Sequence, residues 1–250
     1  MKNICSLLVL TILSFTIFAQ DFEGALNIKT TYKQSAKDTT PKISDFKMLV
    51  KGKKAFIDQK DFGRIILNTE KNELLAVLGN GTQPTVWKIN LTTLNQLGGL
   101  LSLMKSITGQ DVMNINAKTV LTATTTTSNI ANYKSTKYTT SDGSHNGTVW
   151  VTTEFPYDLS GIWNSLNIQP ALTNAGITKG TILKANSKSS KTGESNTMII
   201  TPKKQVVEDK VFDIPTKAQV MDITPLLTQM MQNKKPEEVQ QMLQQMMPRK

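Results

Sequence analysis

The sequence predicts a mainly β protein with helices, of the α+β class, in which an antiparallel sheet wraps around a central helix. Short segments rich in alternating or β-branched residues follow one another between residues 21 and 91, and turn-forming residues separate them. Connections this short favour antiparallel neighbours, because parallel strands need crossovers of a dozen residues or more. One long segment with helical spacing, residues 91–107, ends this series, and further strand-like segments follow it.

The strands expected before the central helix begin directly after the N-terminal apolar segment. Residues 21–33 alternate in part between apolar and polar side chains, and residues 44–50 continue through a turn at Gly52 into residues 54–58. The complete set expected here is residues 21–33, 44–50, 54–58, 64–69, 73–78 and 85–91.

The central helix is predicted from the spacing of its apolar residues. Leu94, Leu97, Leu101 and Met104 recur at steps of three and four and form one stripe, which neighbouring leucines widen until the helix is expected to be largely enclosed. Glycines 98 and 99 cost roughly 1 kcal/mol each there relative to alanine. Either a strand or a ligand approaches the backbone closely at this point, or the segment breaks into two short helices.

After the central helix the sequence predicts more strands and two short helical regions. A strand over residues 118–127 and a hairpin follow, and Trp150 is expected on the face opposite to Val149 and Val151. A short helix containing Trp163 ends before Pro170. The complete expectation is strands at 118–127, 129–140, 147–154, 180–187 and 196–208, and a helix at 159–168.

The first twenty residues carry an export signal. Lys2, an apolar run over residues 4–18 and the small Ala19 form the pattern of a secretory signal peptide. The run of about 15 residues is shorter than the ~20 that span a bilayer. Cys5 lies at its start, whereas the modified cysteine of a lipoprotein would lie at its end. We expect a periplasmic or secreted protein that is not a lipoprotein, with outer-membrane association left open.

The chain is expected to have one main domain. Its composition, 38% hydrophobic and 19% charged, is typical of a soluble globular protein. The expected organisation is a signal peptide over residues 1–19, a single β-rich domain over residues 20–223 and an amphipathic, methionine-rich helical tail over residues 224–250.

The formal net charge of +10 comes from scattered lysines. The basic residues form no arginine-rich helix and are not interleaved with aromatics as in nucleic-acid binders, so no nucleic-acid partner is expected. Solvated strand faces account for most of the charge. The alternative is attraction to a membrane surface of anionic lipid or glycolipid.

The sequence contains no recognisable catalytic or metal-binding motif. Cys5 is the single cysteine, and it lies in the signal peptide. His145 is the single histidine, and in a strand its side chain would diverge from that of Ser144. No nucleophile elbow, zinc-binding HExxH helix or phosphate loop is present. We therefore expect no enzyme activity, no metal and no cofactor.

The tail concentrates methionines on an apolar helical stripe. Met242, Met246 and Val239 share this stripe, and Pro236 precedes it at a position that favours a helix start. The stripe either packs on the sheet as core, or forms a lid over an apolar cavity or a site for a partner, since methionines adapt to varied apolar surfaces. Copper binding through thioethers is the third alternative.

Several short motifs resemble a domain-of-unknown-function family of secreted Gram-negative proteins, itself similar to the LolA/LolB lipoprotein-carrier superfamily. The motifs are FEG at residues 22–24, KGKKAFID at 51–58, IANYKSTKY at 130–138, VWVTTE at 149–154 and VFDIPTKAQVMD at 211–222. The resemblance spans residues 22–223. It implies a curved, half-open antiparallel β-barrel whose apolar concave face is covered by helices. Family members usually carry an arginine where this chain has Ala55 and Phe56, so no charged carrier residue is transferred.

Together these observations predict a non-catalytic envelope protein that binds an apolar ligand, either a lipid or an acylated protein, in a concave sheet. Two alternatives remain: a structural or protein-interaction module with a filled core, and a hydrolase whose carboxylates converge only in the fold. The oligomeric state is not predicted. The side chains expected to contact an apolar ligand are Leu97, Leu101, Met104, Trp150, Trp163, Met242 and Met246.

Overall fold

Most of the chain after the predicted signal peptide is described by the computed structural model. The described residues are 21–59, 63–78, 83–100, 115, 118–141, 145–235, 238–239 and 242. The signal peptide predicted at residues 1–19, residues 101–107 of the predicted central helix, and Met246 lie outside them.

Strands account for most of the described residues. The first six are β1 (Glu23–Lys33), β2 (Lys42–Lys51), β3 (Lys54–Gln59), β4 (Gly63–Asn68), β5 (Glu73–Leu78) and β6 (Thr85–Asn90). The other six are β7 (Val120–Ile130), β8 (Tyr133–Ser141), β9 (His145–Thr152), β10 (Thr181–Ser189), β11 (Ser195–Lys204) and β12 (Gln219–Asp222). The helices are α1 (Leu91–Gln96), α3 (Ser160–Ser165), α4 (Gln169–Asn174), α5 (Thr224–Asn233) and the 3-10 helix η1 (Asp209–Phe212).

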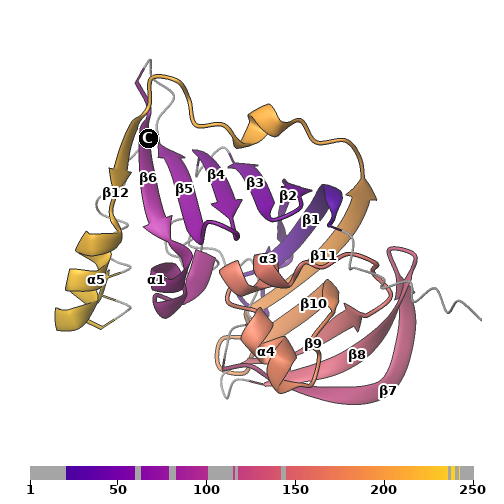
Figure 1. Ribbon diagram of the computed structural model, residues 1–250. Coiled ribbons are helices and arrows are strands. Elements are labelled where there is room, and N and C mark those ends of the chain that lie inside the picture. Colours follow the sequence, from indigo (N-terminus) through magenta and orange to yellow (C-terminus); the bar gives the residue numbers. More distant parts are fainter. Residues whose placement is uncertain are drawn as a thin grey trace, which may run out of the picture.

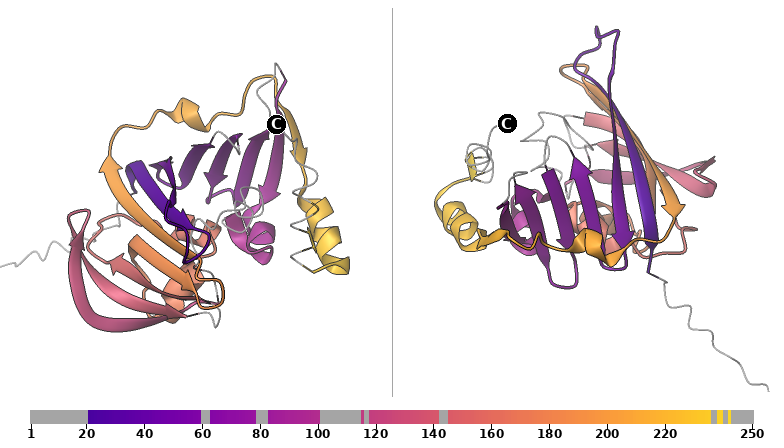
Figure 2. Two further views of the ribbon diagram at one scale, coloured as in Figure 1. Left: turned by 180° about the vertical axis from the view of Figure 1, so that it is seen from behind. Right: turned by 90° about the horizontal axis from the view of Figure 1, so that it is seen from above.

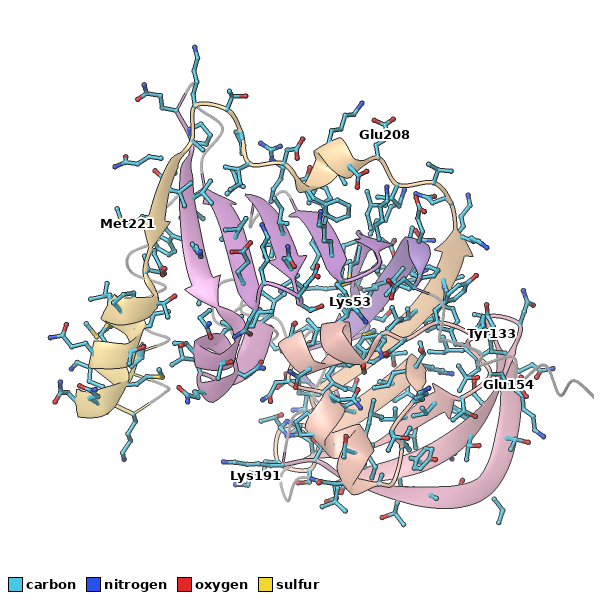
Figure 3. The ribbon with its side chains drawn as sticks, viewed as in Figure 1. Lys53, Tyr133, Glu154, Lys191, Glu208 and Met221 are labelled. Atoms are coloured by element: carbon cyan, nitrogen blue, oxygen red, sulfur yellow. The ribbon has the colours of Figure 1, made fainter. Side chains whose placement is uncertain are left out.

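These strands form one curved, open sheet (Figure 1). Its strand order is β12-β6-β5-β4-β3-β2-β1-β11-β10-β9-β8-β7, so β12 and β7 are its two edges. In Figure 3, Met221 on β12 and Tyr133 on β8 mark opposite ends of the sheet. The predicted mainly β fold with helices is confirmed, and the sheet is open rather than closed into a barrel.

The expectation of a purely antiparallel sheet is wrong at one edge. β12 pairs parallel with β6, from Gln219 opposite Thr85 to Asp222 opposite Lys88, whereas the other neighbouring strands pair antiparallel. The parallel pairing requires a long connection, and residues 205–218 provide it by crossing the outside of the sheet from β11 to β12 (Figure 2, orange). The sequence of β12 gave no alternation signal, because all four of its residues are exposed.

The second expected hairpin has a different boundary from the one predicted. The expected strand over residues 129–140 is divided by a two-residue turn at Ala131 and Asn132, which have φ values of +49° and +68°. Positive φ at both positions is the geometry of the tight hairpin turns that match strand twist. β7 therefore ends at Ile130 and β8 begins at Tyr133.

The predicted central helix breaks after its first turns. α1 ends at Gln96, and the backbone then passes through Gly98 and Gly99 at φ values of +94° and +79°. A Cβ atom added to Gly99 would lie 2.6 Å from the Cβ of Asn167, which follows α3. The predicted break is confirmed, and the backbone is also approached closely here, by the turn after α3 and not by a strand or a ligand.

One further helix was not expected. The sequence pattern predicts that Pro170 follows the end of a helix, but Pro170 lies in the first turn of α4. Proline is tolerated there because its missing N–H would have no partner within the helix. The helix predicted at residues 159–168 is therefore α3 followed by a turn, and α4 is a separate helix.

The two faces of the sheet are buried by different segments. The helices cover the concave face, where their apolar side chains join those of the strands in one cluster. On the outside, residues 205–218, here called the strap, cover β3 to β6 and bury Ile66, Val77 and Val86 with Phe212. The strap is fixed where Glu23 Oε1 accepts a hydrogen bond from Val207 N over 2.8 Å and where Lys51 Nζ lies 3.0 Å from Asp209 Oδ2. The outer face of β1 and β8–β11 lies beyond this cover.

Candidate ligand-binding face

The concave face of the sheet is lined by apolar side chains at alternate positions of its strands. In β1, Leu26 and Ile28 point to this face, while Asn27 and Lys29 point away from it. The same alternation places an apolar layer along the sheet, formed by Leu26, Ile28, Met48, Val50, Ala55, Ile57, Ile65, Leu67, Leu74, Trp87, Ile89, Val149, Val151, Ile182, Ala185, Met198 and Ile200. This layer is what an acyl chain or a helix would contact.

Four short helices cover the apolar layer. Leu94 of α1, Trp163 of α3 and Leu227 of α5 are each no more than 1% exposed. α1 packs against β6, α3 and α5, and α3 packs against α4. α1, α3 and α4 have six residues each. Isolated helices shorter than about 12 residues are marginal in water, so these helices depend on their contact with the sheet.

α1 and α5 start at one shared junction. The Asn90 side chain caps α1 by accepting hydrogen bonds from Thr92 N over 2.9 Å and Thr93 N over 3.3 Å. The backbone N–H of Asn90 donates to Thr224 Oγ1, the first residue of α5, over 3.0 Å. Hydrogen bonds from the hydroxyl and the backbone N–H of Thr224 hold the pKa of Asp222 below its ordinary value. The N-terminal ends of both helices are thus fixed to the end of β6.

α3 is fixed by a carboxylate before its first turn. Asp158 Oδ1 accepts a hydrogen bond from Ser160 N over 2.8 Å. Burial of Asp158 opposes ionisation, but hydrogen bonds from the side chain and backbone of Ser160, with weaker attraction to Lys53 and Lys179, outweigh it and lower the pKa of Asp158. Asp158 is therefore a charged anchor for α3 at neutral pH.

Two buried polar atoms on the covering helices have no hydrogen-bond partner in the described part of the chain. They are the acceptor Asn95 Oδ1 on α1 and the donor Trp163 Nε1 on α3. Buried polar groups in native proteins are nearly always paired, and an unpaired one calls for an explanation. Because α1 packs against α3, this donor and acceptor belong to one region of an otherwise apolar interior.

The structure brings together only some of the residues predicted to contact a ligand. Leu97 and Trp163 are buried in the concave cluster, at 2% and 1% exposure. Trp150 lies on the convex face, because it alternates with Val149 and Val151. Met242 is 37% exposed beyond α5. Leu101, Met104 and Met246 lie outside the described residues. The sequence analysis missed Asn95, whose signal is an amide between Leu94 and Leu97 of the apolar stripe.

The described residues also bear on metal binding and membrane spanning. Over the described ranges, no group of three or more His, Cys, Asp or Glu side chains is placed to hold a metal ion. The helices in those same ranges include none long and apolar enough to cross a bilayer.

Comparison with known proteins finds likeness only in structure. No family model matches the chain, and no curated protein matches its sequence. Among solved structures, PNGF-II matches with 14% identity and a TM-score of 0.40, over 84% of this chain and 33% of that one, so this chain spans about a third of PNGF-II. A LolA superfamily protein from Nitrosomonas europaea matches with 12% identity and a TM-score of 0.32, over 78% of this chain and 91% of that one.

A third structural neighbour is a domain named as a candidate outer membrane lipoprotein-sorting protein, from Vibrio parahaemolyticus. It has 9% identity and a TM-score of 0.32, over 77% of this chain and 89% of that one. A LolA superfamily structure is therefore among the solved structures similar to this chain.

Proposed function

We propose that the chain is a non-catalytic protein of the cell envelope that binds an apolar ligand, a lipid or the acyl chain of a lipoprotein, between the concave face and helices α1 and α3. The observation that carries the proposal is the unpartnered pair Asn95 Oδ1 and Trp163 Nε1 within an apolar interior. The predicted signal peptide supports the envelope location.

The polar pair indicates the chemistry of the ligand. A hydroxyl or a protonated carboxyl group can accept a hydrogen bond from Trp163 Nε1 and donate one to Asn95 Oδ1. The remaining contacts of the site are apolar, which suits a hydrocarbon chain that gains about 0.8 kcal/mol for each buried CH₂ group. A long-chain fatty acid or a hydroxylated acyl chain satisfies both conditions.

The short helices provide a way for such a ligand to enter. α1 and α3 stay on the sheet because their side chains pack against it, not because such short helices are stable by themselves. An acyl chain that replaces these apolar contacts can therefore displace the two helices from the sheet. The break at Gly98 and Gly99 separates α1 from the residues that follow, which lets α1 move as a short unit.

A second candidate function is an interaction module whose concave face is permanently filled. It is favoured by the burial of the lining, since every side chain in the concave cluster is 8% exposed or less. In that case the helices are a fixed part of the core. Any binding of a ligand would then not depend on Asn95 Oδ1 and Trp163 Nε1.

Binding of palmitic acid to full-length protein distinguishes the two functions. Trp163→Phe keeps an aromatic ring and removes only the N–H donor, so it is expected to weaken palmitic acid binding roughly two- to tenfold, the value of one hydrogen bond. Trp150→Phe is the matched control, because it makes the same exchange on the convex face, outside the proposed site. Displacement of a fluorescent fatty acid measures the affinity of both variants for palmitic acid. A wild-type protein that binds no fatty acid, or equal losses in both variants, would contradict the proposed site.

A further inference from the structure

Lysines that are scattered in the sequence meet on the convex face of the sheet. The strand registers place Lys29 opposite Ile199, Ile199 opposite Lys184, Lys184 opposite Trp150, and Trp150 opposite Lys137. Residues directly opposite on neighbouring strands share a face. These five side chains, here called the lysine row, therefore form one line across β1, β11, β10, β9 and β8.

More lysines surround the row on the same face. Lys47 lies opposite Asn27, Lys203 opposite Ala25, and Lys188 four residues beyond Lys184 along β10. The acidic residues at outward positions of β1, β2 and β8–β11 are Glu23, which binds the strap, and Asp45, which lies opposite Lys29. In the described part of the chain, none of the row's three lysines forms an ion pair.

The same face exposes apolar side chains among the lysines. Ile199 is 37% exposed within the row and Ile43, at an outward position of β2, is 59% exposed. The indole of Trp150 is partly exposed between Lys184 and Lys137. Tryptophan and isoleucine beside lysines are the side chains that a protein places at a membrane–water interface, where the lysines contact phosphates and the apolar groups enter the head-group layer.

The covering of the outer face ends before this region. The strap buries the outer apolar residues of β3 to β6, whereas no described segment forms such a cluster over the lysine row. An open depression of about 340 Å³ lies beside the row, lined by Asn27, Ile28, Lys29, Asp45, Phe46, Lys47 and Thr201. Two ammonium groups, an amide and a hydroxyl around this depression can contact a phosphate, and the carboxylate of Asp45 offsets one of the two positive charges.

We propose that the lysine row is a docking surface for an anionic phospholipid bilayer. The charge complementarity is the argument, because a strongly cationic face with exposed Trp150 and Ile199 matches a surface that is anionic outside and apolar beneath. A soluble anionic polysaccharide would match the lysines but would not account for the exposed isoleucines. The proposal is independent of the fatty acid site: vesicle binding without fatty acid binding supports docking and contradicts only the proposed ligand.

The test uses full-length protein and vesicles of phosphatidylcholine with or without phosphatidylglycerol. Binding is expected only with phosphatidylglycerol and is expected to weaken as salt is raised. Each lysine near an anionic surface contributes about fivefold in affinity, so Lys29→Gln, Lys137→Gln and Lys184→Gln together are expected to reduce it on the order of 100-fold. Brominated lipids are expected to quench tryptophan fluorescence through Trp150, because Trp87 and Trp163 are buried, and Trp150→Phe should remove that quenching.

The matched control removes the same charge elsewhere. Lys71→Gln, Lys217→Gln and Lys234→Gln change three exposed lysines outside the convex face of β1 and β8–β11, and vesicle affinity is expected to stay within about threefold. Equal losses in the two triple variants would show attraction by net charge alone and overturn the proposal. So would equal binding to phosphatidylcholine, or binding to dextran sulfate through the same three lysines without binding to vesicles.

Discussion

Leu94→Asp is expected to leave the protein largely unfolded at 25 °C. Leu94 is 1% exposed in the concave cluster, where α1 meets the sheet. The substitution removes a buried leucine, which costs about 2–5 kcal/mol, and leaves a buried carboxylate without a partner, which costs several kcal/mol more. The sum approaches the 5–15 kcal/mol that typically stabilises a whole domain. Circular dichroism during thermal melting measures this loss of stability.

The same substitution on the exposed side of α1 is the control. Gln96 is exposed at the end of α1, so Gln96→Asp is expected to lower stability by less than about 1 kcal/mol, through its position at the negative end of the helix. A Leu94→Asp variant that melts at the wild-type temperature would show that α1 does not belong to the folded core.

Gly99→Ala is expected to destabilise the protein by about 2–4 kcal/mol. At φ +79° a side chain strains the backbone, and the added Cβ would lie 2.6 Å from the Cβ of Asn167 and 3.2 Å from its backbone nitrogen. Either α1 or the turn after α3 must then shift. Thermal or urea unfolding gives the change in the free energy of unfolding.

Gly176→Ala separates backbone strain from the close contact. Gly176 has a similar φ of +77°, but a Cβ there would meet nothing within 4 Å. This variant is expected to lose only about 1–2 kcal/mol, the cost of the left-handed backbone. If the two glycine variants lose equal stability, the close approach of α1 to α3 is not the reason for Gly99.

The elements that the sequence predicted well are those in which local pattern and tertiary burial agree. β1 and β2 alternate between a buried apolar face and a more polar one, and β4 to β6 are short apolar segments between turn residues, so their positions follow from side chains alone. β12 has no such pattern, because its parallel pairing with β6 depends on the course of the strap. α4 was missed because Pro170 fits both after a helix and at the start of one.

The candidate site was only partly predictable, because its parts depend on register between distant strands. Helical spacing identified Leu97, and the same reasoning identified Trp163. The position of Trp150 follows from its alternation with Val149, but that alternation does not say which face is concave. Lys29, Lys137 and Lys184 meet only through four strand pairings. Two of these pairings, β1 with β11 and β9 with β10, join strands that are separated by long stretches of sequence.

Native mass spectrometry of the full-length protein, incubated with palmitic acid and transferred without detergent, tests the central claim most directly. The proposed apolar site predicts a species heavier by one palmitic acid, at a fraction that falls in Trp163→Phe and is unchanged in Trp150→Phe. A spectrum that contains only the unliganded mass, at palmitic acid concentrations well above those of the protein, would contradict a ligand site on the concave face and favour the permanently filled core.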